Sequence, residues 1–162
     1  MTGSILDEMI LFQDFSPEQR TRLRPLFQYT FAPSGMQIFE QGQPAEHLYI
    51  VVQGEIHIHY KPDDGPLMTV ARIRPEGVVG WSAAIGSLRY TSSAVCATDS
   101  QMLRVRSSDL RRLCEQYPST GDLLLEKLAI IVAERLRCTH PQVLALLQQG
   151  LHLPVHPYIP AG

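Results

Sequence analysis

The sequence predicts a mainly β fold, a sandwich or barrel of short strands with flanking helices. Between residues 31 and 106, short β-like runs are separated by Gly, Pro and Asp, as in the strands and turns of such folds. Helical periodicity precedes this region and returns after it. The chain has 162 residues, 44% of them hydrophobic, which is enough for one compact domain.

A short helix is expected to begin after Ser16. Pro17 occupies the first helical position and Gln19 lies three residues after the serine, which is the pattern of a capping box. Pro25 cannot donate to the helical hydrogen-bond ladder, so this helix should kink or stop near Arg24.

Seven segments of the central region are expected to be strands. They are Phe31 with its neighbours, Met36–Phe39, His47–Gln53, Glu55–Tyr60, Met68–Ile73, Ser93–Ala97 and Gln101–Arg106. Turns are expected at residues 40–43 and 53–54. The segment at 61–66 is rich in Pro, Asp and Gly and predicts a hairpin loop.

Two helices should close the domain. Ser108 or Asp109 can cap the first, which Pro118 ends. Ser119 is expected to cap a longer helix that ends near Cys138. Apolar residues cover most faces of this long helix, so either it is deeply buried in the core, or one side packs on the barrel and another meets a second subunit. The face expected to contact a second subunit consists of Leu124, Leu128 and Ile131.

Composition excludes several classes of protein. The net charge is −2, from 14 Lys and Arg against 16 Asp and Glu, whereas nucleic-acid binders normally carry a basic excess. A modest basic cluster consists of Arg104, Arg106, Arg111 and Arg112. Because Asp109 and Glu115 interleave with it, a solvated, salt-bridged surface is expected there.

The sequence also argues against a membrane, an export or a metal function. No apolar run reaches the roughly 20 residues that span a bilayer, and acidic Asp7 and Glu8 do not fit a secretory signal, so a cytoplasmic protein is expected. Three cysteines give neither a CxxC pair nor an even disulfide framework. His57 and His59 alternate with isoleucines that should face inward, so both histidines should face water and no metal site is expected. Signatures of serine nucleophiles, P-loops and dinucleotide sites are absent, which argues against an enzyme.

Three stretches carry a resemblance to a known family. They are IFEQGQPAEHLYIVVQGEIHI at 38–58, ARIRPEGVVGWSAAIGSLRYTSSAVCA at 71–97 and SSDLRRLCEQYPSTGDLLLEKLAIIVAERLR at 107–137. In order and spacing they resemble the cyclic nucleotide-binding domain of bacterial catabolite-activator-type regulators, kinase regulatory subunits and gated channels. The resemblance covers roughly residues 8 to 138. It implies a jelly-roll-like β-barrel (31–106) with closing helices (108–138) in one domain over 1–140, and a short helical turn and Pro-rich tail over 141–162.

The resemblance implies a phosphate-binding cassette within residues 71–97. In the family, backbone N–H groups at the start of a short helix meet the cyclic phosphate, which suits the positive end of a helix. A Glu then accepts from the ribose and an Arg neutralises the phosphate, but here Trp81 and Thr91 stand at those two positions. Arg89 lies two residues before Thr91, a displacement of about 6 to 7 Å along an extended chain. The candidate ligand-binding residues are Gly80, Trp81, Ser82, Ala83, Arg89, Thr91 and Ser92.

For Trp81, expected at the mouth of this pocket, three roles stay open: stacking on a base, plugging the ribose site, or filling the core. The hydroxyls of Ser82, Thr91, Ser92 and Ser93 can coordinate another anion or polar ligand, or bond nearby backbone.

Two functions follow as expectations. The first is a non-catalytic regulatory or sensor module that binds cAMP, cGMP or another small anion with altered specificity and repositions the long helix. The second is a dimerisation or protein-docking module that has lost its nucleotide ligand. Only 24 residues follow Cys138, too few for the helix-turn-helix that related transcription factors carry, so a truncated DNA-binding regulator is the less favoured third reading and no nucleic-acid contact is expected.

Overall fold

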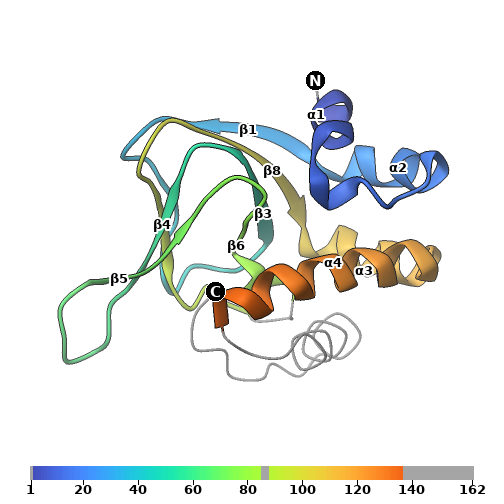
Figure 1. Cartoon of the computed structure of the whole chain (residues 1–162). Coiled ribbons are helices and arrows are strands. Elements are labelled where there is room, and N and C mark those ends of the chain that lie inside the picture. Colours follow the sequence, from blue (N-terminus) through green and yellow to red (C-terminus); the bar gives the residue numbers. More distant parts are fainter. Residues whose placement is uncertain (1, 85–87, 137–162) are drawn as a thin grey trace.

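A computed structural model describes residues 2–84 and 88–136 of the chain (Figure 1). The helices lie together on one side of the strands, and the β4–β5 hairpin projects on the other. The predicted tail over 141–162, and the predicted helix end near Cys138, lie outside the described residues.

The N-terminal segment consists of short helices. They are α1 (Thr2–Glu8), the 3-10 turn η1 (Ile10–Phe12), α2 (Pro17–Leu23) and the 3-10 turn η2 (Arg24–Leu26). The predicted capping box at Ser16 is confirmed: its hydroxyl accepts from the Gln19 N–H at 3.1 Å, and the Gln19 side chain accepts from the Ser16 N–H at 2.9 Å. The α-helix ends at Leu23, as Pro25 predicted. Helix α1 was not among the elements expected from the sequence.

Eight strands form two antiparallel four-stranded sheets, ordered β1-β8-β3-β6 and β2-β7-β4-β5. The strands are β1 (Gln28–Ala32), β2 (Gln37–Phe39), β3 (His47–Gln53), β4 (Ile56–Tyr60), β5 (Met68–Ile73), β6 (Val78–Val79), β7 (Ser93–Cys96) and β8 (Ser100–Arg106). The predicted jelly-roll-like fold is confirmed, and all seven expected strands are present. Strand β6 was not expected from the sequence, because its two residues are too few to show an alternation.

Two apolar clusters make up the core. The barrel core lies between the sheets and includes Phe39, Tyr49, Ile56, Ile58 and Tyr90. The helix-side core lies between the strands and the helices, and includes Phe12, Leu48, Trp81, Leu103, Leu124 and Leu128. The second cluster joins the barrel to the C-terminal helix.

The two closing helices are α3 (Ser107–Gln116) and α4 (Pro118–Leu136). Arg106 precedes the first turn of α3 and no side chain caps it, so the predicted caps at Ser108 and Asp109 are wrong. Helix α4 begins at Pro118, because proline suits a first helical position, and Ser119 therefore lies inside the first turn.

The predicted face for a second subunit needs correction. Leu124 and Leu128 are each 1% exposed, because both pack into the helix-side core of their own chain. Ile131 is only partly buried, and its neighbour Ile130 is 41% exposed. Helix α4 therefore turns Leu124 and Leu128 inward and presents Ile130 to solvent.

Candidate functional site

The predicted cassette begins at a sharp turn after β6. Gly80 has a φ of 76°, and a Cβ there would lie 3.1 Å from the His47 carbonyl and 3.2 Å from the Tyr90 ring. Only glycine combines this left-handed backbone with so close an approach. The turn leads into the short 3-10 helix η3 (Trp81–Ala83), whose residues are all buried. Gly80 thus brings the start of the cassette against Tyr90, which lies between Arg89 and Thr91 in the chain.

Trp81 does not lie at the mouth of a pocket. Its side chain is 0% exposed and belongs to the helix-side core with Leu124, Leu125 and Leu128 of α4. Of the three roles open at the sequence level, the structure therefore favours the core filler. The indole joins the cassette to α4 rather than presenting a surface to a ligand.

Buried polar atoms gather in the cassette. Trp81 Nε1, Ser82 Oγ and Thr91 Oγ1 have no hydrogen-bond partner within the part of the chain that the structure describes. Ser82 and Ser92 are 0% exposed. Buried polar groups are nearly always bonded, and leaving one unpaired costs about 1–3 kcal/mol. Ser82 and Thr91 therefore retain unused donor capacity.

Arg89 is held by the turn between β2 and β3. Its Nη1 donates to the Gly42 carbonyl at 2.6 Å, and its backbone forms an antiparallel bridge with Pro44. The residue is exposed. The Gly42 N–H in turn donates to the Tyr90 carbonyl at 2.9 Å. The guanidinium thus braces the loop in this structure.

Tyr90 is a site residue that the sequence analysis did not single out. Its ring stacks on Phe39 with centroids 3.7 Å apart and planes 13° from parallel. Its hydroxyl donates to the His47 carbonyl at 2.7 Å and accepts from the His47 N–H at 3.1 Å. Burial raises the pKa of the Tyr90 hydroxyl above its usual value. In the sequence, the position of Tyr90 directly after Arg89 was the only feature that could have pointed to it as a site residue. In the structure, the rings of Phe39 and Tyr90 together occupy part of the barrel interior.

Comparison with known proteins identifies the fold. The sequence profile of the cyclic nucleotide-binding domain matches residues 30–117. This chain belongs to the cyclic nucleotide-binding domain family. The family profile covers both sheets, the cassette and α3.

Relatives of the chain include regulators. The chain is 28% identical over 127 residues to the cyclic AMP receptor protein of Thermus thermophilus, covering 78% of this chain and 57% of that protein. It is 25% identical over 146 residues to a CRP-like cAMP-activated global transcriptional regulator of Mycobacterium tuberculosis, covering 88% and 63%. The chain therefore spans about six tenths of the length of these relatives.

A solved structure supports the fold. A cyclic nucleotide-binding domain from Methylobacillus flagellatus has a TM-score of 0.73 at 23% identity, over 84% of this chain and 76% of that one. In the described part of this chain, no helix is long and apolar enough to cross a bilayer.

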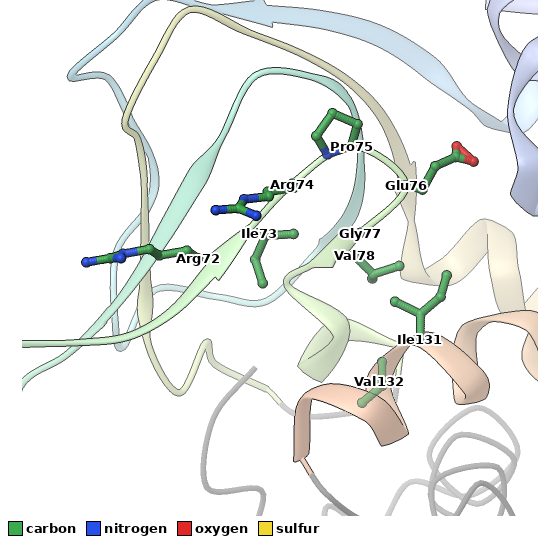
Figure 2. A pocket seen from close by; sticks show the side chains of 9 residues that line it. All are labelled: Arg72, Ile73, Arg74, Pro75, Glu76, Gly77, Val78, Ile131 and Val132. Atoms are coloured by element: carbon green, nitrogen blue, oxygen red, sulfur yellow. The ribbon is translucent and has the colours of Figure 1, made fainter.

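A cavity of about 480 Å³ lies between the β5–β6 turn and α4 (Figure 2). Ile131 of α4 points toward Val78, and the side chains of Arg72 and Arg74 point away from them. Glu76 Oε1 accepts from the Leu11 N–H at 3.2 Å, which ties this turn to η1. None of the candidate ligand-binding residues lines this cavity.

The two histidines of β4 are arranged as predicted. Ile56 and Ile58 are 0% exposed, whereas His57 and His59 lie on the other face of the strand. His57 Nε2 lies 2.8 Å from Glu55 Oε2, and Arg74 Nε donates to the other oxygen of this carboxylate at 3.3 Å. Across residues 2–84 and 88–136, no three His, Cys, Asp or Glu side chains come together in a way that could hold a metal ion.

Proposed function

We propose that this chain is a non-catalytic regulatory domain whose cassette holds a small ligand through hydroxyl and main-chain donors instead of a Glu and an Arg. The observation that supports this is the pair of buried, unpartnered hydroxyls of Ser82 and Thr91. A ligand that accepts hydrogen bonds would satisfy the two hydroxyls. The buried serine of η3 and the threonine of the following segment are then the specificity-determining residues.

Binding of cAMP and cGMP should be weak. The resemblance implies an acid at position 81 and an arginine at position 91, where this chain has Trp81 and Thr91. Each charge-assisted contact that is lost is worth about 1.5–3 kcal/mol. Two such losses weaken binding at least about a hundredfold.

Trp81 provides the route from the cassette to the output helix. Its indole packs in the same cluster as Leu124 and Leu128 of α4. A ligand that binds more tightly to one arrangement of η3 would therefore favour one position of α4, which is a population shift.

Titration calorimetry with cAMP and cGMP tests the proposal, after mass spectrometry has shown that no nucleotide co-purifies. The wild type should give no binding below about 100 μM, and Thr91→Arg should gain at least about tenfold in cAMP affinity. Ser82→Ala is the companion variant, because it removes an unpartnered hydroxyl without creating a charge. Tight binding of cAMP by the wild type would contradict the proposal, and its loss in Arg89→Ala would assign the phosphate to a rearranged site.

A dimerisation or protein-docking module without a small ligand is the second candidate. The Phe39–Tyr90 stack occupies space in the barrel interior, which favours this alternative. Ile130 on α4 offers an exposed apolar side chain for a second copy. Sedimentation of the wild type and of Ile130→Glu tests it, since only a dimer through α4 would dissociate in the variant.

A further inference from the structure

A basic groove runs between η2 and α3, on the side of the barrel away from the β4–β5 hairpin. It consists of two adjoining cavities of about 310 and 340 Å³, which share Pro25, Leu26 and Asp109 in their walls. One end is lined by β1, β3 and β8, on the sheet face that also carries Tyr49 and Met102 of the barrel core, and α3 lines the other end from Asp109 to Gln116. No residue of the cassette lies in either cavity.

Positive charge gathers at the sheet end of the groove. Arg104 and Arg106 alternate along β8, so their side chains share one face of the sheet. His47 lies opposite Arg106 in the neighbouring strand, and Gln28 lies opposite Arg104. Arg104 Nε donates to Gln28 Oε1 at 3.0 Å, and this partner is neutral.

The nearby carboxylates do not neutralise these two arginines. Asp109 lines the groove but lies 3.6 Å from Arg112 Nη1, with which it pairs. Neither Arg104 nor Arg106 forms an ion pair with any residue that the structure describes. Burial and then the charges of Arg104 and Arg106 hold the pKa of His47 below its usual value. The groove therefore carries two arginines that form no ion pair within the described residues, and Asp109 and Glu46 are the carboxylates whose charges reach His47.

The helix end of the groove adds apolar surface. Leu26, Leu113 and Tyr117 line it, and the Arg22 guanidinium lies 4.1 Å above the Tyr117 ring. A groove whose walls include two leucines and an aspartate suits a nucleic-acid backbone poorly, because binding of that backbone depends on several Lys or Arg side chains that neutralise phosphates. Alternating apolar and acidic side chains match it better.

We propose that this groove binds an acidic segment of a partner protein, with carboxylates at Arg104 and Arg106 and an apolar side chain against Leu26 and Tyr117. Residues 137–162 contain no Asp or Glu, so this part of the chain supplies no side-chain carboxylate. Bidentate arginine–carboxylate pairs would give such an interface geometric specificity as well as binding energy. The interaction is separate from ligand binding in the cassette.

A fluorescein-labelled peptide of about twelve residues with alternating Glu and Leu is the probe, measured by fluorescence anisotropy. The double variant Arg104→Gln/Arg106→Gln should bind it at least about tenfold more weakly than the wild type. The matched control is Arg72→Gln/Arg74→Gln, which removes the same charge from β5 and the turn that follows it, outside the groove, and should change the affinity less than about twofold.

Three results would overturn the proposal. One is no peptide binding by the wild type at about 1 mM; another is an equal loss of affinity in both double variants, which would indicate unspecific charge attraction. The third is tighter binding of a single-stranded DNA of equal charge with the same dependence on Arg104 and Arg106. Far-UV circular dichroism of each variant establishes that it folds. Because the assay contains no cyclic nucleotide, its outcome does not depend on the function proposed for the cassette.

Discussion

Replacing Trp81 with alanine should destabilise the domain strongly. The indole is 0% exposed in the helix-side core, and a buried Trp removes about 200 Å² from water. At about 25 cal/mol per Å² this corresponds to an upper estimate near 5 kcal/mol. Its unpartnered Nε1 offsets part of that gain. We expect the free energy of unfolding to fall by about 3–5 kcal/mol, a large share of the stability of a small domain.

Urea unfolding followed by far-UV circular dichroism measures this loss, since the substitution removes the only tryptophan. Trp81→Phe keeps most of the apolar volume and removes the unpartnered N–H, so it should cost less than about 1.5 kcal/mol. Leu88→Ala is the control, because Leu88 is 72% exposed in the following segment and should change stability by less than about 0.5 kcal/mol. A loss below about 1 kcal/mol in Trp81→Ala would refute the assignment of the indole to the core.

Three further predictions concern pH, thiol chemistry and backbone strain. The pKa of His47 in the folded state lies below 6.5, so as pH falls the unfolded state takes up a proton before the folded state does. The free energy of unfolding should therefore fall as pH drops below 6.5. In urea titrations at several pH values, a His47→Gln variant should lose this dependence of the free energy of unfolding on pH. Burial raises the pKa of the Cys114 thiol to about 11, so in a Cys138→Ser background iodoacetamide at about pH 8 should modify Cys114 far more slowly in native than in urea-unfolded protein. Gly54→Ala places a Cβ at a residue with a φ of 99° and 2.6 Å from the Asp99 carbonyl oxygen. It should therefore lower the free energy of unfolding more than Gly42→Ala, whose Cβ would meet nothing within 4 Å. Equal losses in the two variants would show that the close approach to Asp99 is unimportant.

Much of the fold could be predicted because its signals are local. Alternation located His47–Gln53 and Met68–Ile73 to the residue, and the Ser16 capping box needed only neighbouring positions. The two-residue strand β6 gives no such alternation. The inward turn of Leu124 and Leu128 was missed because an all-round apolar helix does not reveal which face its own chain covers.

The candidate site was harder to predict because it depends on side-chain direction. Spacing placed Trp81 in the cassette, but only the fold shows that its indole points into the helix-side core. The Phe39–Tyr90 stack joins residues that lie far apart in the chain. The basic groove was missed for a related reason: Asp109 interleaves with the arginines in the sequence, whereas in the fold it pairs with Arg112 and leaves Arg106 without an ion pair.

Calorimetric titration of the nucleotide-free wild type and of Thr91→Arg with cAMP tests most directly the claim that this cassette has an altered specificity. We expect no binding below about 100 μM by the wild type and a gain of at least about tenfold in Thr91→Arg. Micromolar binding by the wild type, with no gain from the new arginine, would contradict it.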